Sequence, residues 1–179
     1  MLIKILIGVA AAIVVLVVVI AFQPGEFRVT RSALMPVPAA AVFAQVNDFH
    51  KWEAWSPWAK RDPAAKNTFA GAAAGTSAVF AWDGNNQVGA GRMTITESRP
   101  SESIRLKLEF FRPLAGISTT EFTFKPEGNQ TAVTWSMVGE TSFIGKAIHL
   151  FVNMDKMVGG DFESGLASMK AAAEAAGKP

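Results

Sequence analysis

Side chains suited to proton transfer are scarce in this chain of 179 residues, which contains two histidines, His50 and His149, and neither tyrosine nor cysteine. A histidine changes its charge near neutral pH, which makes it the usual general acid or base. Neither histidine has a carboxylate at a spacing that predicts a catalytic triad or a metal site. Without cysteine, disulfides, thiolate nucleophiles and thiolate metal ligands are excluded. We therefore predict no catalytic residue, no metal and no cofactor.

The segment VGAGRM, with Gly89 and Gly91, has a superficial likeness to a phosphate-binding loop. It lacks the further glycines, the lysine and the strand-to-helix context that such loops need. Glycines inside a strand more often permit a bulge or a sharp bend, which is our prediction here. Four charged residues could lie at the mouth of a pocket, although a solvent-facing position on a strand is the favoured interpretation: Arg92, Glu97, Arg99 and Arg112.

Three of the five tryptophans, Trp52, Trp55 and Trp58, follow one another at three-residue spacing in HKWEAWSPWAKRDP. A short helix is expected to end before Pro57, which leaves Trp58 in a loop. The surrounding charges are mixed and the formal net charge is only +2, so no basic groove for nucleic acid is predicted. In one interpretation, Trp52 and Trp55 seal the helices onto a sheet. In the other, Trp55 and Trp58 form an aromatic lip that touches a ligand or the lipid interface.

The N-terminal segment has an uninterrupted apolar run from Ile5 to Phe22, close to the ~20 residues that a bilayer span requires. We predict a transmembrane anchor over residues 1–22, a linker over 23–26 and a single domain over 27–179. A cleaved signal peptide is the alternative, because small residues precede a cleavage point near Ala21. The very short N-terminal tail favours a cytoplasmic N-terminus, which would make this a single-pass membrane protein with an extracytoplasmic domain.

After the apolar run, the hydrophobic pattern predicts strand, short helices, strands and a long helix. FRVTRSAL alternates like a strand, Pro38 suits the first turn of a helix, and several strand patterns follow Pro63. In SIRLKLEFF, apolar residues alternate with charged ones, as in a half-buried antiparallel strand. From Ser142 onward the period becomes helical. The predicted class is α+β: a curved antiparallel sheet of about six to seven strands wraps around a long C-terminal helix, with two short helices after the first strand.

The strand parity assigns aromatic residues and methionines to the inner face of this sheet, and the long helix would face them with Met154, Met157, Val158 and Phe162. An ordinary filled core and an adaptable apolar pocket both fit this composition, because methionine repacks around irregular ligands. Thr120 is the main polar residue at an inward position, which argues against catalysis. We predict that a hydrophobic ligand contacts these cavity and rim residues: Trp55, Trp58, Phe80, Trp82, Met93, Leu108, Phe110, Phe122, Trp135, Met137, Met154 and Phe162.

Several stretches carry a family resemblance, namely FRVTRS after the apolar run, VFAQVNDFHKWEAWSPW, WDGNNQVGAGRMTITESRP, TAVTWSMVG and MDKMVGGDFESGLASMK. Together they resemble the START-like superfamily, also called SRPBCC, of polyketide cyclases, dehydratases and lipid-transfer proteins, and are most similar to its bacterial membrane-anchored members. The resemblance implies a helix-grip fold in which the sheet and the long helix enclose an apolar cavity. It also implies binding of lipids, sterols, polyketides or plant hormones. None of the stretches is a catalytic signature.

Three functions remain open at this point. The leading hypothesis is a membrane-tethered, noncatalytic module that binds a lipid or an isoprenoid-like molecule taken from the adjacent bilayer. The second is a polyketide cyclase or dehydratase, in which His50 or an arginine would polarise a carbonyl group. The third is a protein-interaction module that uses the same fold with a solid core.

Overall fold

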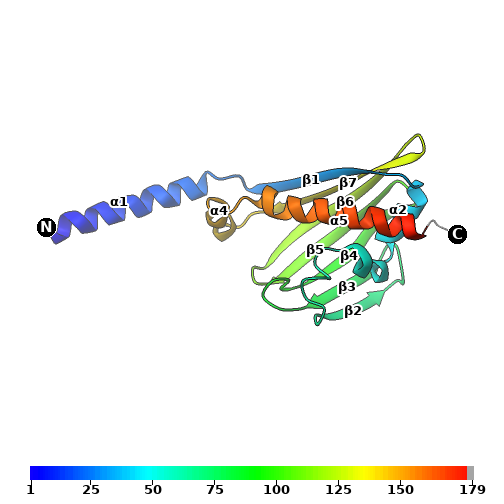
Figure 1. Cartoon of the computed structure of the whole chain (residues 1–179). Coiled ribbons are helices and arrows are strands. Elements are labelled where there is room, and N and C mark those ends of the chain that lie inside the picture. The colour runs from blue at the N-terminus through cyan, green and yellow to red at the C-terminus, as the bar shows by residue number, and fades with distance from the viewer. Residues whose placement is uncertain (177–179) are drawn as a thin grey trace.

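A computed structural model of the chain, which describes residues 1–176, shows an apolar helix leading into a curved sheet that packs against a second long helix (Figure 1). This arrangement confirms the predicted α+β helix-grip fold. The last three residues of the predicted domain, 177–179, lie outside the described residues. The elements are α1 (Leu2–Ala21), β1 (Glu26–Met35), α2 (Ala39–Asn47), the 3-10 turn η1 (Phe49–Lys51), α3 (Trp52–Trp55), β2 (Lys66–Gly71), β3 (Ala78–Asp83), β4 (Ala90–Arg99), β5 (Ser103–Arg112), β6 (Gly116–Glu127), β7 (Gln130–Glu140), α4 (Phe143–His149) and α5 (Met154–Ala176).

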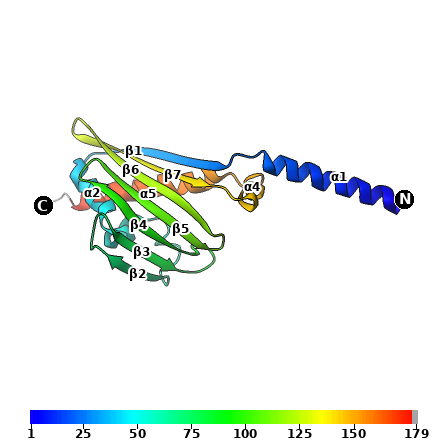
Figure 2. The ribbon, with the colours of Figure 1, turned by 180° about the vertical axis from the view of Figure 1, so that it is seen from behind.

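The seven strands form one antiparallel sheet in the order β1-β7-β6-β5-β4-β3-β2. Figure 2 shows this sheet from the side opposite to α5. Strand pairing places Glu26, Asp83 and Gly116 at one end of the sheet, next to the place where α1 stops, and we call this the α1 end. The opposite end, which we call the far end, contains Met35 and Ser103.

The pairing of β4 with β5 is irregular where the glycines of VGAGRM lie. The register between β4 and β5 shifts between Ala90 and Gly91, which confirms the predicted bulge. A β-carbon on Gly91 would meet the indole of Trp82 and the carbonyl oxygen of Glu109. Gly89 has a φ of +65°, a conformation that favours glycine. Gly91 therefore admits the ring of Trp82, and Gly89 supplies the positive φ needed just before β4.

Helix α5 lies along the concave face of the sheet because one stripe of its surface is apolar. Val158, Phe162, Leu166 and Met169 are buried at helical spacing. The prediction that Met157 also faces the sheet is wrong, since its side chain is 53% exposed. Met157 precedes the stripe by one position, and one residue of helix turns a side chain by about 100°.

Alternation along the central strands places the predicted residues on the concave face. In β5, Ile104 and Leu106 are buried, whereas Arg105 and Lys107 are exposed. A single apolar core joins this face to α2, α3 and α5. The concave face and the elements that cover it are therefore where a site for an apolar molecule has to be sought.

Candidate functional site

Burial of the concave face changes along the strands. Toward the far end the inward-facing side chains are fully enclosed, as Ile95, Ile104 and Phe122 show with 0–1% exposure. Toward the α1 end the inward-facing side chains are packed against the core but only partly buried: Phe80, Trp82, Met93, Phe110 and Met154. Leu108 and Met137 lie between these two groups and are nearly buried. The concave face is therefore fully covered toward the far end and partly exposed toward the α1 end.

Trp52 and Trp55 close the far end. The indole of Trp52 donates to the carbonyl oxygen of Val46 at 2.9 Å, and that of Trp55 donates to the carbonyl oxygen of Gln45 at 3.1 Å. The indole N–H of each ring is thus hydrogen-bonded to a carbonyl oxygen near the end of α2, while the apolar part of the ring is buried. Trp55 is wholly buried, so its position matches the sealing interpretation and not an exposed lip.

An aromatic column fills the space between β7 and α5. The rings of Trp135 and Phe162 stack with centroids 3.9 Å apart and planes 8° apart. Phe122 stacks on Trp135 at 4.8 Å, and Trp55 meets both of these rings edge-on. Trp58 lies in the loop after α3, as expected, and is half-buried with its edge toward Trp135 and Phe162. Five of the predicted residues thus pack against one another in this column: Trp55, Trp58, Phe122, Trp135 and Phe162.

The remaining predicted residues meet at the α1 end. Phe80 lies parallel to Trp82 at 6.1 Å, and Phe110 meets Trp82 edge-on at the same distance. The indole nitrogen of Trp82 donates to the carbonyl oxygen of Val88 at 3.0 Å, which fixes the ring over Gly91. In the sheet, Phe80 pairs with Met93, and Met93 pairs with Leu108. These apolar side chains form a partly buried lining on the concave face of the sheet.

Two polar atoms on the concave face have no hydrogen-bond partner among the described residues. They are Thr120 Oγ1 on β6 and Trp135 Nε1 on β7, whose residues are 4% and 2% exposed. Burying a polar group without a partner is unfavourable, so such atoms call for an explanation. A polar group on a bound molecule would supply the missing partner. The sequence analysis singled out Thr120 as the inward polar position but did not single out the indole nitrogen of Trp135.

Two hollows of the described residues lie mostly outside this lining, and only one of them touches it, at Met154. One, of about 410 Å³, is bordered by the segment from His149 to Met154. The other, of about 220 Å³, lies between Phe49, His50 and the start of the β2–β3 loop. Neither hollow is bordered by Phe80, Trp82, Met93 or Phe110.

His50 has a carboxylate neighbour, Asp48, two residues before it in the chain. Nδ1 of His50 lies 2.9 Å from Oδ1 of Asp48. The same oxygen accepts the backbone N–H of His50 and so caps the 3-10 turn, which makes the contact local. The imidazole stacks on Phe69 and is 57% exposed. His149 meets Phe27 edge-on at 6.0 Å.

The arginines considered for a pocket mouth lie in surface ion pairs. Arg92 pairs with Glu109 at 2.8 Å, and Arg99 pairs with Glu97. Arg112 pairs with Asp83. Lys107 and Arg92 together hold the pKa of the Glu109 carboxyl below its usual range. These pairs favour the solvent-facing interpretation. Among residues 1–176, no cluster of three metal-ligating side chains is found.

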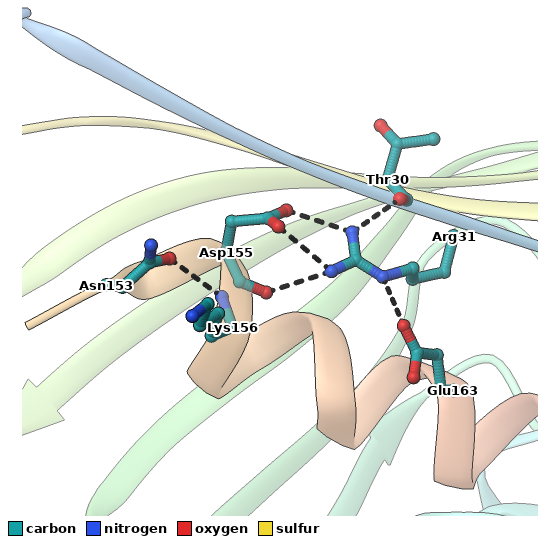
Figure 3. A network of polar contacts seen from close by, with 6 residues as sticks. All are labelled: Thr30, Arg31, Asn153, Asp155, Lys156 and Glu163. Atoms are coloured by element: carbon teal, nitrogen blue, oxygen red, sulfur yellow. Dashed lines mark hydrogen bonds and ion pairs between the residues drawn. The ribbon is translucent and has the colours of Figure 1, made fainter.

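Arg31 is a feature that the sequence analysis missed. It faces Trp135 across the β1–β7 pair, so it occupies an inward position on β1. Its guanidinium donates to both carboxylate oxygens of Asp155, at 2.9 and 3.0 Å, and to Glu163 at 2.6 Å (Figure 3). Gly159 makes room for it, because a β-carbon there would collide with the guanidinium. The sequence did contain a signal: in the alternation of FRVTRSAL, Arg31 is a charged residue at a position that faces the sheet interior.

This ion-pair network joins α5 to the edge strand β1. Arg31 lowers the pKa of the Asp155 carboxyl, chiefly through the hydrogen bonds that it donates to it. Arg31 also donates to the carbonyl oxygen of Asp155 at 3.1 Å, within the first turn of α5. The first turn of α5, next to Met154, is thereby held against the sheet.

An α+β protein of the helix-grip type is the class that this fold defines. The chain belongs to the family described as polyketide cyclase / dehydrase and lipid transport, whose profile matches residues 26–174. This membership confirms the resemblance to the SRPBCC superfamily. A comparison with curated proteins found no match.

Solved structures share the fold at low sequence identity. Protein CV1439 from Chromobacterium violaceum is 15% identical, with a TM-score of 0.59, and the match covers 85% of this chain and 99% of that one. The di-domain ARO/CYC StfQ from the steffimycin biosynthetic pathway is 13% identical, with a TM-score of 0.60 and coverage of 83% and 51%. The Aha1 dimer from Colwellia psychrerythraea is 13% identical, with a TM-score of 0.59 and coverage of 83% and 96%. At these identities the likeness concerns the fold alone.

Proposed function

We propose that this chain is a membrane-tethered, noncatalytic module that holds a hydrophobic molecule, such as a lipid or an isoprenoid, at the α1 end of its concave face. The observation that carries the proposal is the partly open lining of Phe80, Trp82, Met93, Phe110 and Met154. It lies at the end of the domain nearest α1, which is long and apolar enough to cross a membrane. An apolar molecule leaving a bilayer would meet this end first.

The unpartnered atoms Thr120 Oγ1 and Trp135 Nε1 lie deeper along the strands, level with Leu106 and Phe122, where a molecule that extended inward from the α1 end would meet them. A lipid or isoprenoid alcohol has an apolar body and one polar group, and that combination matches an apolar lining with two unpaired polar atoms on neighbouring strands. Methionines at positions 93, 137 and 154 give the lining the adaptability that an unspecialised apolar site requires. The extracytoplasmic location of the domain and its boundaries at residues 22 and 26 are parts of this proposal.

Extraction and mass spectrometry test the proposal directly. The full chain is purified from membranes in a lipid nanodisc, and small molecules retained per protein are compared between wild type and two variants. Phe110→Ala removes a lining ring, whereas Phe111→Ala removes the adjacent ring, which is 53% exposed on the other face of β5. We expect one enriched apolar molecule that is lost from Phe110→Ala and retained by Phe111→Ala. Equal, background-level content in all three proteins would overturn the proposal.

A protein-interaction module is the second candidate, and the packed aromatic column favours it. The stacking of Trp135 on Phe162 at 3.9 Å leaves no room between these rings, as a domain without a ligand would require. This candidate predicts background ligand content in every variant of the extraction experiment. The cyclase or dehydratase alternative is weaker, because Arg31, the charged residue on the inward side of β1, is neutralised by Asp155 and Glu163.

A further inference from the structure

Large apolar side chains are exposed in the segment that connects β7 to α5. Phe143 is 51% exposed, Ile144 63% and Phe151 86%. The segment contains the short helix α4, whose other residues include the basic Lys146 and His149. A combination of exposed apolar side chains and basic groups is typical of segments that lie at a lipid–water interface.

Contacts with α1 place this segment at the level where a membrane span would end. Nζ of Lys146 donates to the carbonyl oxygen of Ala21, the last residue of α1, at 3.3 Å. A cation is favourable at that position, because the C-terminus of a helix carries partial negative charge. Ile20 is the buried residue of α1, in the last turn of the helix, and Phe22 beyond it is 86% exposed. Figure 1 shows α4 directly beside the end of α1.

The position of α4 is also fixed from the side of the domain. Arg31 holds the first turn of α5 through Asp155, and the side chain of Asn153 accepts the backbone N–H of Lys156 at 2.9 Å (Figure 3). His149 meets Phe27 of β1 edge-on. The segment between β7 and α5 thus contacts β1 through His149 and joins α5 at a turn that Arg31 holds.

We propose that Phe143, Ile144 and Phe151 insert into the lipid headgroup region, so that the α4 segment docks the domain on the bilayer with its α1 end toward the lipid. The partner is a lipid surface. The inference extends the proposed function by naming the surface from which a ligand would enter. It rests on α1 lying in the bilayer and does not depend on any ligand being bound.

Depth-dependent quenching tests this docking in the full chain reconstituted in phosphatidylcholine vesicles. Because the chain has no cysteine, one introduced cysteine carries one environment-sensitive NBD fluorophore. The test positions are Ile144→Cys and Phe151→Cys. Leu34→Cys is the control, since Leu34 is an exposed apolar residue, at 49%, toward the far end of β1. Ile13→Cys reports on α1 itself.

We expect blue-shifted emission at positions 144 and 151 that a shallow doxyl-labelled phosphatidylcholine quenches, with no quenching at position 34. Position 13 is expected to be quenched by a deeply placed doxyl group. Quenching at position 13 together with unquenched probes at 144 and 151 would overturn the docking while leaving the tether intact. A blue shift at 144 and 151 that is insensitive to doxyl lipid would also overturn it, in favour of contact with a second copy of the chain. An unquenched probe at position 13 would remove the tether, and both proposals with it.

Discussion

The two ends of the concave face contain the same kinds of side chain, yet they are packed differently. At the far end Trp55 and Phe122 are wholly enclosed by α2, α3 and the sheet. At the α1 end Trp82 and Phe110 touch each other but keep part of their surface in water. Aromatic content alone therefore does not distinguish a core from a binding surface. The two ends differ in whether helices such as α2 and α3 cover the aromatic side chains.

The largest expected effect is on stability at the far end. Trp55→Ala removes a wholly buried ring and should lower the free energy of unfolding by about 3–5 kcal/mol. Phe110→Ala removes a ring that is already partly in water, so the free energy of unfolding should fall by clearly less than in Trp55→Ala. Denaturant unfolding of both variants, followed by circular dichroism, measures the difference. Equal losses would show that the two ends are packed alike and would remove the distinction between core and lining.

Thr120→Val is expected to have a smaller effect of opposite sign. The substitution replaces a buried hydroxyl without a partner by a methyl group of similar shape, so the free energy of unfolding should rise by about 1 kcal/mol. If a ligand's polar group bonds to this hydroxyl, ligand retention should fall in the same variant. Thr119→Val, at the neighbouring exposed position of β6, is the control. A loss of stability in Thr120→Val at unchanged ligand content would mean that the hydroxyl is satisfied inside the protein.

The sequence predicted which residues share the concave face better than it predicted how they are covered. The period of two along a strand assigns Trp82, Phe110 and Trp135 to one face without any knowledge of the rest of the chain. The enclosure of Trp55 depends on contacts with Phe122 and Trp135, which lie far along the chain. No local pattern reports such contacts, so the split between core and lining was not predictable.

Arg31 illustrates the same limit for charged groups. Its position in the alternation of β1 was visible in the sequence, and an arginine at an inward position of a strand is a signal. Its partners, Asp155 and Glu163, are more than 120 residues away, and the small residue that admits it, Gly159, could equally have marked a bend. Only the approach of α5 to β1 brings the four residues together.

The smallest expected effect concerns the pH dependence of this network, which holds α5 beside the α1 end. Because Arg31 lowers the pKa of the Asp155 carboxyl in the folded chain, the unfolded chain binds a proton there more readily. The contribution of this pair to stability is therefore complete above the ordinary range of a carboxyl pKa, and it disappears as the pH falls through the lowered value. Asp155→Asn should remove that part of the acid dependence while changing stability near neutral pH only modestly, since the Asp155 side chain is 58% exposed and Arg31 keeps its ion pair with Glu163.

Two glycine variants separate the ion pairs from the helix itself. Gly160→Ala faces open space, so it should raise the free energy of unfolding by up to about 1 kcal/mol through helix propensity and leave the acid dependence unchanged. Gly159→Ala gains the same propensity but displaces the guanidinium of Arg31, and should therefore reproduce the flattened acid dependence of Asp155→Asn. Unfolding free energies measured from neutral to acidic pH distinguish the two. If Gly159→Ala retained the full acid dependence, Arg31 would have another way to reach Asp155, and the α1 end would be less tightly held than the contacts indicate.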